Sequence, residues 1–476
     1  MAAEPRIVNV IGHTGDIAKL PEFSPALLAP GENWTGTAGG EARTGTANDD
    51  TLNGAGGDDQ LFGGEGNDTL YGGDDKDTLA GGLGRDLLEG GGGFDFASYA
   101  QAETGLTISL ANPILNTGEA AGDRYDSIQG VIGSTFNDWI MGSLDHDHLI
   151  GGNGSDTLEG GAGIDTLEGG AGDDVYIDPF GDIILDSGGN DTIRTSKSYT
   201  LTEGFVIENL MALDPTGSIA LTLTGNSLNN TLVGNRGANF LDGKGGADIL
   251  MGGLGDDVYK VDQLGDQIRD ANSGGFDTVL ASSSYSLVRD AEIEVLKLED
   301  LASSASYHLD GSDTSNAITG NEGANLLRGY GGQDLIQAGS GNDTIYGGTD
   351  NDTLYGSSGM DRLYGEAGRD IFVFDTAARK SNVDRIYKYN VKDDTIWLDN
   401  AVFTKLGKGS PSKPLKLKSG MFAMSDKAKD SSDRILYDKK TGALYYDRDG
   451  TGSAAKVKVA TLDKKLKLSY HDFFVI

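Results

Sequence analysis

Leucines return at every ninth position between residues 52 and 88 of this 476-residue chain. Leu52, Leu61, Leu70, Leu79 and Leu88 keep this spacing, and mostly polar or glycine residues lie between them. A short segment with one regularly placed aliphatic residue is typical of a strand that points a single side chain inward. A repeat this short cannot bury its apolar side alone, so its copies must stack on one another. The pattern predicts a ladder of short strands with leucine in the core.

An aspartate stands two positions before each of these leucines, and a glycine-containing turn precedes the aspartate. The clearest copy, residues 63–71, reads GGEGNDTLY. Glycine allows positive φ and lets backbone carbonyls come close to an ion. Ca²⁺ takes about 6–8 oxygen ligands, so carbonyls and one carboxylate per turn are suitable chemistry for it. The turns therefore predict calcium binding.

The unit resembles the RTX (repeats-in-toxin), or haemolysin-type, calcium-binding nonapeptide repeat, and it occurs in four arrays. The aspartates expected to bind calcium are Asp50, Asp59, Asp68, Asp77, Asp86 and Asp95 in the first array, Asp138, Asp147, Asp156, Asp165 and Asp174 in the second, Asp248 and Asp257 in the third, and Asp334, Asp343, Asp352, Asp361 and Asp370 in the fourth. The resemblance implies an all-β fold, a parallel β-roll or β-solenoid in several arrays with a strand-rich C-terminal domain. It also implies ions between turns 18 residues apart, on the order of ten Ca²⁺ in all.

Asparagine replaces the aspartate at Asn230 and Asn239 in the third array, and at Asn316 and Asn325 in the fourth. An asparagine keeps a carbonyl oxygen but loses the negative charge. We expect these turns to bind calcium weakly or not at all, and their asparagines to be structural.

A longer repeat links the arrays. Asp174-Val175-Tyr176 recurs as Asp257-Val258-Tyr259, and alternating stretches such as Leu221–Thr224 predict strands between the arrays. These stretches are expected to continue the solenoid. The expected organisation is an N-terminal segment (1–44), a first roll and linker (45–132), a second array with coils (133–224), a degenerate third array (225–310), a fourth array (311–376) and a capping, secretion-signal domain (377–476).

Charge is unevenly distributed about a net value of −35. Residues 1–376 hold 61 acidic and 17 basic side chains, whereas residues 377–476 hold 12 acidic and 21 basic ones. The acidic body repels itself unless divalent cations neutralise it, which predicts metal-dependent folding. The same charge excludes nucleic acid as a partner.

Enzyme motifs are absent from the sequence. There is no cysteine, no His-Glu-x-x-His, no Gly-x-Ser-x-Gly and no phosphate-binding loop. Residues 97–133 resemble linkers in the calcium modules of alginate epimerases, but a catalytic domain is missing, since only about 44 residues precede the first repeat. We therefore expect no enzymatic activity.

Other possible ligand sites are weaker. His146 and His148 flank Asp147 but have no third zinc ligand in view, and zinc sites normally need three or four. Residues 447–450 have some likeness to an EF-hand loop, but its third acidic residue is missing and Lys458 stands where the bidentate glutamate belongs. The lysines between residues 405 and 418 are expected to form a solvated face.

The two ends of the chain bear on export. Residues 1–6 lack the cationic and apolar regions of a cleaved signal, and no run of 18 apolar residues predicts a transmembrane helix. The last residues, Asp472–Ile476, resemble the uncleaved C-terminal signal that directs RTX proteins through a type I ABC exporter, which implies a secreted bacterial protein. Expected partners are calcium, that exporter, and a cell-surface polysaccharide or host surface.

Three functions remain open from the sequence. The first is adhesion or surface association by a secreted calcium-binding protein, because solenoids present long binding faces. The second is an RTX toxin or bacteriocin-like activity, although no apolar amphipathic region precedes the repeats. The third is an enzyme whose site lies among the clustered carboxylates.

Overall fold

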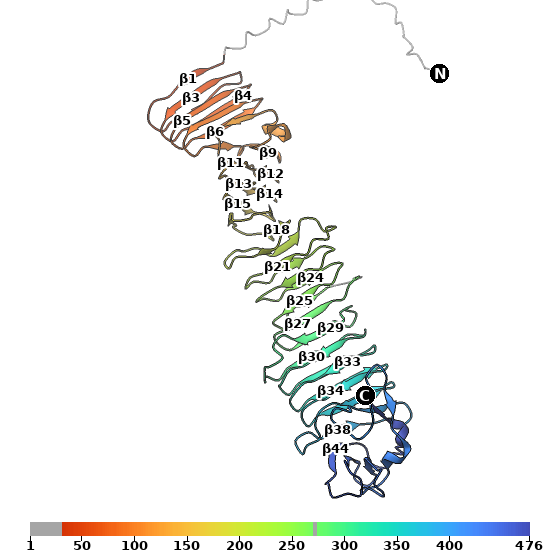
Figure 1. The fold of residues 1–476 in the computed structure, drawn as a ribbon. Helices are drawn as coiled ribbons and strands as arrows, with labels where there is room; N and C mark the ends of the chain where they lie inside the picture. The colour runs from red at the N-terminus through yellow and green to blue at the C-terminus, as the bar shows by residue number, and fades with distance from the viewer. Residues whose placement is uncertain (1–30, 270–273) are drawn as a thin grey trace, which may run out of the picture. The chain divides into compact units, whose positions relative to one another are not determined.

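A computed structural model describes residues 31–269 and 274–476 (Figure 1). The expectation about residues 1–6 falls outside these ranges. The chain divides into two compact units, one formed by the residues up to Tyr99 together with Glu119–Ile128, and the other by Ala100–Gly118 together with Gln129–Ile476. Each unit is built almost entirely from short parallel strands.

The strands of the first unit alternate between two sheets. They are β1 (Asn33–Thr35), β2 (Ala42–Thr44), β3 (Thr51–Gly56), β4 (Gln60–Glu65), β5 (Thr69–Asp74), β6 (Thr78–Leu83), β7 (Leu87–Gly92), β8 (Phe96–Ser98) and β10 (Arg124–Asp126). One sheet has the order β1-β3-β5-β7-β10, and the other contains β2-β4-β6-β8. Each strand therefore pairs with the next but one along the chain.

The nine-residue period explains this alternation. Leu52 pairs with Leu70, and Leu70 with Leu88, so one full coil takes 18 residues and uses two repeats. Leu61 and Leu79 pair in the same way in the opposite sheet. All five leucines are completely buried, and burial of one such side chain stabilises the fold by about 1.5–3 kcal/mol. The predicted leucine core is confirmed.

The second unit continues the same alternation over many more coils. Its solenoid strands are β9 (Thr107–Ser109), β11 (Gly130–Ile132), β12 (Trp139–Met141), β13 (His148–Asn153), β14 (Thr157–Glu159), β15 (Thr166–Ala171), β16 (Val175–Ile177), β17 (Ile183–Leu185), β18 (Thr192–Thr195), β19 (Tyr199–Thr200), β20 (Asn209–Ala212), β21 (Thr222–Thr224), β22 (Thr231–Val233), β23 (Phe240–Asp242), β24 (Ile249–Met251), β25 (Val258–Val261), β26 (Gln267–Ile268), β27 (Thr278–Ala281), β28 (Tyr285–Ser286), β29 (Val295–Leu298), β30 (His308–Asp310), β31 (Ala317–Thr319), β32 (Leu326–Tyr330), β33 (Leu335–Gln337), β34 (Thr344–Thr349), β35 (Thr353–Tyr355), β36 (Arg362–Ala367), β37 (Ile371–Phe374), β38 (Asp384–Tyr387) and β39 (Thr395–Leu398).

The stretches between arrays belong to this solenoid, as the alternation of residues 221–224 predicts. β16 pairs with β18, β18 with β20, and β20 with β22, so irregular coils join the second array to the third in one sheet. Loops of unequal length absorb the extra residues while the strands stay in register. The all-β parallel solenoid expected from the sequence is confirmed.

The C-terminal residues end the parallel pattern (Figure 1). β42 (Ile435–Asp438), β43 (Ala443–Tyr446) and β44 (Val457–Thr461) pair antiparallel, and β44 joins the solenoid through β38. β45 (Phe473–Val475) lies beside β39, and the short strands β40 (Leu415–Lys416) and β41 (Phe422–Ala423) extend the two sheets. Phe473 and Val475 are buried at this junction. The remaining helical turns are 3-10 helices at Pro113–Leu115, Gly118–Ala120, Ser419–Met421 and Tyr470–Asp472.

Candidate metal centres

Each array turn runs from a glycine at position 1 (alanine at Ala338) to an aspartate or asparagine at position 6, and the position-6 side chains form a ladder. The backbone N–H of Asp50 donates to Oδ1 of Asp68 at 2.7 Å, and that of Asp68 donates to Oδ1 of Asp86 at 2.7 Å. The same bond between residues 18 apart recurs in every array, as at Asp138 with Asp156 (2.8 Å). One carboxylate oxygen of most position-6 aspartates is thus used to hold successive coils together, whereas Oδ1 of Asp147 is buried without a hydrogen-bond partner.

The second carboxylate oxygen, Oδ2, faces another acceptor. A Cβ placed on Gly63 would collide with both Oδ2 of Asp68 and the carbonyl oxygen of Gly81, so these two oxygens lie on either side of one small space. Among the described residues, Oδ2 is buried without a hydrogen-bond partner in Asp59, Asp68, Asp77, Asp86, Asp156, Asp165, Asp174, Asp248, Asp334, Asp343, Asp352 and Asp370. Two buried acceptors with no donor between them require a cation or a proton.

Backbone conformation divides the turns into two kinds. In what we call open turns, positions 2 and 4 both have positive φ, even where a non-glycine residue occupies position 2, as at Lys244 (63°) and Tyr330 (74°). The position-6 residues of the open turns are Asp59, Asp68, Asp77, Asp86, Asp95, Asp156, Asp165, Asp174, Asp248, Asp257, Asp334, Asp343, Asp352, Asp361 and Asp370. Positive φ costs energy for residues with Cβ, so its recurrence there indicates a conformation fixed by the turn.

The remaining array turns, which we call closed turns, lack positive φ at positions 2 and 4. Their position-6 residues are Asp50, Asp138, Asp147, Asn230, Asn239, Asn316 and Asn325. Where the residue is aspartate, serine or threonine stands at position 2 and its N–H donates to Oδ2, at 2.6 Å from Ser143 to Asp147. The Ser143 hydroxyl donates to the same oxygen at 2.9 Å. Local hydrogen bonds therefore use the oxygen that has no partner in open turns such as those of Asp68 and Asp156.

Asn239 and Asn325 place their amide nitrogen in the same space, whereas Asn230 and Asn316 place Oδ1 there. Asn239 Nδ2 donates to the carbonyl of Gly237 at 2.6 Å and to that of Gly252, 13 residues ahead, at 3.2 Å. The Gly252 carbonyl corresponds to the one that faces Oδ2 in an open turn. Asn230 Nδ2 donates instead to the carbonyl of Ile207, at 2.8 Å. In the Asn239 turn a side-chain N–H thus supplies the donor that an open turn lacks, whereas in the Asn230 turn Oδ1 accepts from the backbone N–H of Asn226 at 2.9 Å.

Burial raises the pKa of the open-turn aspartates. Removal from water is the largest cause, and neighbouring aspartates add to it, so the pKa of Asp68 rises to about 6 and that of Asp156 to about 7. For Asp352 the pKa rises to about 8, again through burial first and then through the charges of Asp334, Asp370 and Asp350. A bare carboxylate is therefore unfavourable in these turns at neutral pH.

The ladder extends to acidic residues that the sequence analysis did not assign as ligands. Asp86 donates its N–H to Asp123 Oδ1 at 2.9 Å, Asp174 donates to Asp191 Oδ1 at 2.8 Å, and Asp191 donates to Glu208 Oε2 at 2.8 Å. Asp370 donates to Asp394 at 3.2 Å. The sequence signal for Asp191 and Asp394 is the following Thr-Ile pair, which repeats the end of the nonapeptide. Asp123 and Glu208 have no such signal.

The two histidines beside Asp147 bind other groups. The His146 ring nitrogen Nδ1 accepts from the backbone N–H of Ile164 at 2.7 Å. His148 Nε2 lies 3.4 Å from a carboxylate oxygen of Glu168. Both contacts belong to the stacking of neighbouring coils.

A parallel β-solenoid whose turns present carbonyls and carboxylates in phase defines a class of repeat protein. The family model of the RTX calcium-binding nonapeptide repeat matches the chain at residues 35–70, 44–79, 63–97, 132–167, 150–177, 224–259, 310–345 and 337–372. The chain therefore contains RTX calcium-binding nonapeptide repeats, and no catalytic family is among its matches. A search of curated proteins found no match. Across residues 31–269 and 274–476, no helix is long and apolar enough to cross a membrane.

Proposed function

We propose that this RTX protein is secreted, folds when it meets extracellular calcium, and acts in adhesion or surface association. The observation that carries the proposal is a buried Oδ2 that faces a backbone carbonyl and has no hydrogen-bond donor, as in Asp59, Asp68, Asp77, Asp156, Asp334 and Asp352. A divalent cation between the two oxygens removes their repulsion and joins successive coils. Calcium fits because it accepts many oxygen ligands in flexible geometry, whereas Mg²⁺ demands near-octahedral geometry.

The open-turn aspartates are the proposed ligands, with ions on the order of ten along the chain. Asp50, Asp138 and Asp147 are proposed as weaker ligands, because hydrogen bonds from Thr46, Ser134 and Ser143 already use their Oδ2 atoms. The asparagine turns are proposed to take no ion.

Calcium concentration then decides where the chain folds. Sites with Kd near about 10⁻⁴–10⁻³ M stay empty in a cell that keeps free calcium below the micromolar range, and fill outside it. The proposed export signal near the C-terminus fits this order of events. Phe473 and Val475 are buried in the folded chain, so an exporter reaches them only before folding.

A surface on the fourth array supports an adhesive role. A cavity of about 760 Å³ is lined by residues that include Arg289, Arg328, Tyr330 and Tyr346. The Arg289 guanidinium lies 3.4 Å from the centroid of the Tyr330 ring. Aromatic rings with a few directed polar groups are the usual lining of a ligand site. Arg289 and Arg328 pair with Asp313 and Asp310 at 2.9 and 3.1 Å, so the proposed partner is a polysaccharide whose carboxylates compete with these aspartates for the guanidinium groups.

Circular dichroism during calcium titration tests the calcium-dependent folding. We expect a disordered spectrum in chelator, a cooperative gain of β-signal as calcium rises towards the millimolar range, and little response to Mg²⁺. The same β-signal in chelator and in calcium, with no ion retained, would contradict the proposal.

Export and biological role need separate measurements. Deletion of residues 417–476 is expected to stop export in a host that carries a type I exporter, and continued export would contradict that route. Binding to an acidic polysaccharide should weaken in Arg289→Ala but not in Arg236→Ala, a change to another exposed arginine of the same unit. Leakage of lipid vesicles or inhibition of bacterial growth would support a toxin instead, and turnover of polysaccharide at constant calcium would support an enzyme.

A further inference from the structure

The turn at residues 186–191 reads DSGGND and follows directly on the second array. Position 1 of the array turns is glycine, or alanine at Ala338, and this turn has Asp186 there instead. A position-1 residue lies beside the Oδ2 of an open-turn aspartate, as Gly63 lies beside Asp68. A carboxylate in that position is therefore placed next to the ladder of position-6 aspartates.

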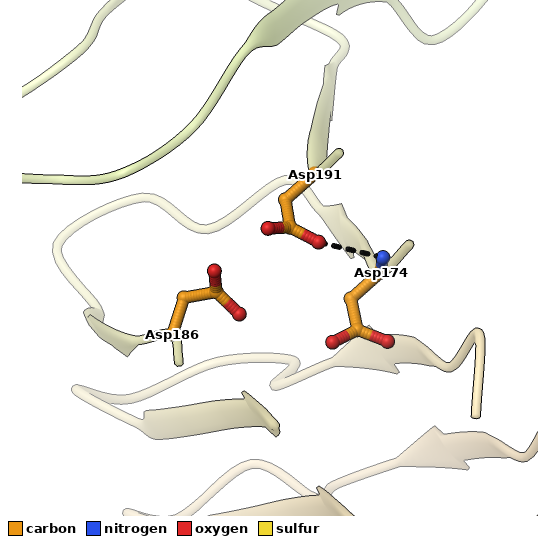
Figure 2. A group of neighbouring side chains, drawn as sticks. All are labelled: Asp174, Asp186 and Asp191. Atoms are coloured by element: carbon orange, nitrogen blue, oxygen red, sulfur yellow. Dashed lines mark hydrogen bonds between the residues drawn. The ribbon is translucent and has the colours of Figure 1, made fainter. Parts of the chain in front are cut away.

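Three carboxylates meet at this point (Figure 2). One oxygen from each of Asp174, Asp186 and Asp191 lies within 4.8 Å of the others. Asp174 and Asp191 are held by the ladder, in which the Asp174 N–H donates to Asp191 Oδ1 at 2.8 Å. Figure 2 shows the Asp186 carboxylate reaching towards them from the opposite side of the turn.

Tyr176 orients Asp186. Its hydroxyl donates to Asp186 Oδ1 at 3.2 Å and accepts from the Gly169 N–H at 3.1 Å. Tyr176 occupies the core position that leucine or isoleucine fills in most repeats, and it is completely buried. A polar tip at a core position is retained where it has a partner to bind, and here that partner is the third carboxylate.

All three residues of the cluster have a carboxylate oxygen without a hydrogen-bond partner. Asp174 and Asp191 are both 0% exposed, and Oδ2 of each has no hydrogen-bond partner. Asp186 Oδ2 is also buried without a partner. Two buried carboxylates and the half-buried Asp186 carboxylate share one small space, and they repel one another unless a cation or a proton lies between them.

We propose that Asp174, Asp186 and Asp191 form a calcium site of higher charge than the array sites, which fills at lower free calcium and closes the second array. The inference rests on the proposed calcium-dependent function and assigns to it a specific first step. Affinity for calcium rises with the number of charged ligands and with the rigidity of the site. Asp186 adds a charge, and Tyr176 and the ladder fix the geometry.

Equilibrium dialysis of the full chain against calcium buffers of increasing free calcium tests this site. The wild-type chain should take up one ion at a free calcium concentration about tenfold below that needed by the remaining sites. In Asp186→Asn, that ion should bind only at the free calcium concentrations that the remaining sites need. Asp186→Gly, which restores the repeat glycine, should have the same effect. The control Asp290→Asn removes an exposed charge elsewhere in the same unit and should leave the curve unchanged. Circular dichroism in millimolar calcium checks that each variant folds.

The outcomes separate this inference from the function on which it rests. If the wild-type chain takes up ions but has no tighter class, or if Asp186→Asn leaves the tighter class in place, the inference is wrong and calcium-dependent folding stands. An equal shift in Asp290→Asn would also overturn it, because the effect would then be one of general charge. If the wild-type chain binds no calcium at any concentration, the proposed function itself fails.

Discussion

The turns at residues 63–68 and 320–325 differ at three of six positions, GGEGND against GNEGAN, and obtain a positive group in opposite ways. In the first, Asp68 Oδ2 is buried opposite the Gly81 carbonyl with no donor. In the second, Asn325 Nδ2 donates to the carbonyl of Gly323 at 2.9 Å and lies 3.5 Å from that of Ala338. One turn is therefore incomplete without a cation, and the other is complete as a polypeptide.

The backbone follows the same division. Gly64 and Gly66 have φ of 115° and 129°, whereas Asn321 and Gly323 do not have positive φ. Yet both turns keep the ladder, because the N–H of Asp68 donates to Asp86 at 2.7 Å and that of Asn325 to Asp343 at 2.6 Å. The stacking of coils is thus common to both kinds of turn, and the need for calcium is a local property.

Removal of calcium should have the largest effect, and it should be unequal along the chain. Each ion with Kd near 10⁻⁴ M contributes about 1.4 kcal/mol at 1 mM free calcium, so several ions in one array add up to most of the stability of a small domain. In hydrogen exchange, amides of β4 to β7 should lose their protection in chelator, while those of β22 and β23 beside the asparagine turns should lose less. Equal loss in both regions would contradict the division into two kinds of turn.

Exchanging the sequences of the two turns should have the next largest effect. Gly64→Asn, Asn67→Ala and Asp68→Asn together write the sequence of residues 320–325 into the first array. We expect this triple variant to lose about one bound ion and about 1–2 kcal/mol in calcium. In chelator it should gain stability, because an amide donor replaces a buried charge. Urea unfolding in calcium and in chelator measures whether the change in the free energy of unfolding has opposite signs under the two conditions.

The reciprocal exchange provides the control for the first. Asn321→Gly, Ala324→Asn and Asn325→Asp should add about one calcium ion and make the fourth array less stable in chelator. Ion counting by equilibrium dialysis detects the gain. If neither exchange alters the number of ions, the position-6 carboxylate is not what binds calcium.

The fold could be predicted almost completely from the sequence because it depends on a single nine-residue spacing. The nine-residue recurrence of Leu52 to Leu88 fixes both the strand length and the direction in which each leucine points. Likewise, the alternation at residues 221–224 placed a strand where no repeat aspartate stands, and β21 lies there. Local pattern was sufficient because each coil contacts mainly its neighbours.

The candidate sites were less predictable, because the two kinds of turn differ in backbone angles. Asp147 and Asp156 look alike in phase, but Ser143 at position 2 closes one turn and Gly152 leaves the other open. Serine alone is not decisive, since Ser357 at the same position has φ of 64° in an open turn. Asp186 was missed because it stands at a position that is glycine in the repeat, and only the fold places it beside Asp174.

Lowering the pH should stabilise the calcium-free chain and so substitute for calcium in part. The change in stability should be smaller than that caused by exchanging the two turns. The pKa of Asp248 and of Asp334 is raised to about 7, chiefly by burial, and that of Asp352 to about 8. A carboxyl whose pKa is higher in the folded chain than in the unfolded chain destabilises the fold once it ionises. In chelator, stability should therefore rise as pH falls from about 8 towards 5, within the interval between the folded and unfolded pKa values.

Circular dichroism in chelator at several pH values measures this gain, and the calcium-loaded chain provides the comparison. Protons compete with calcium for the same oxygens, so the apparent calcium affinity of the folded sites should weaken over the same interval. Half-folding should nevertheless need less calcium, because protonation already stabilises the folded chain. Loss of β-signal in chelator as the pH falls from 8 to 5 would mean that the buried carboxylates do not limit folding.

The smallest expected effect concerns a closed turn that contains aspartate. The Ser143 hydroxyl donates to Asp147 Oδ2 at 2.9 Å, beside the 2.6 Å bond from its own N–H. Ser143→Ala keeps the N–H and removes the hydroxyl, and should cost about 1 kcal/mol in urea unfolding with calcium present. The matched change Ser155→Ala removes an exposed hydroxyl at position 5 of an open turn and should stay within about 0.5 kcal/mol. If both substitutions cost the same, then the hydroxyl does not close the turn, and the difference between Asp147 and Asp156 must come from the backbone alone.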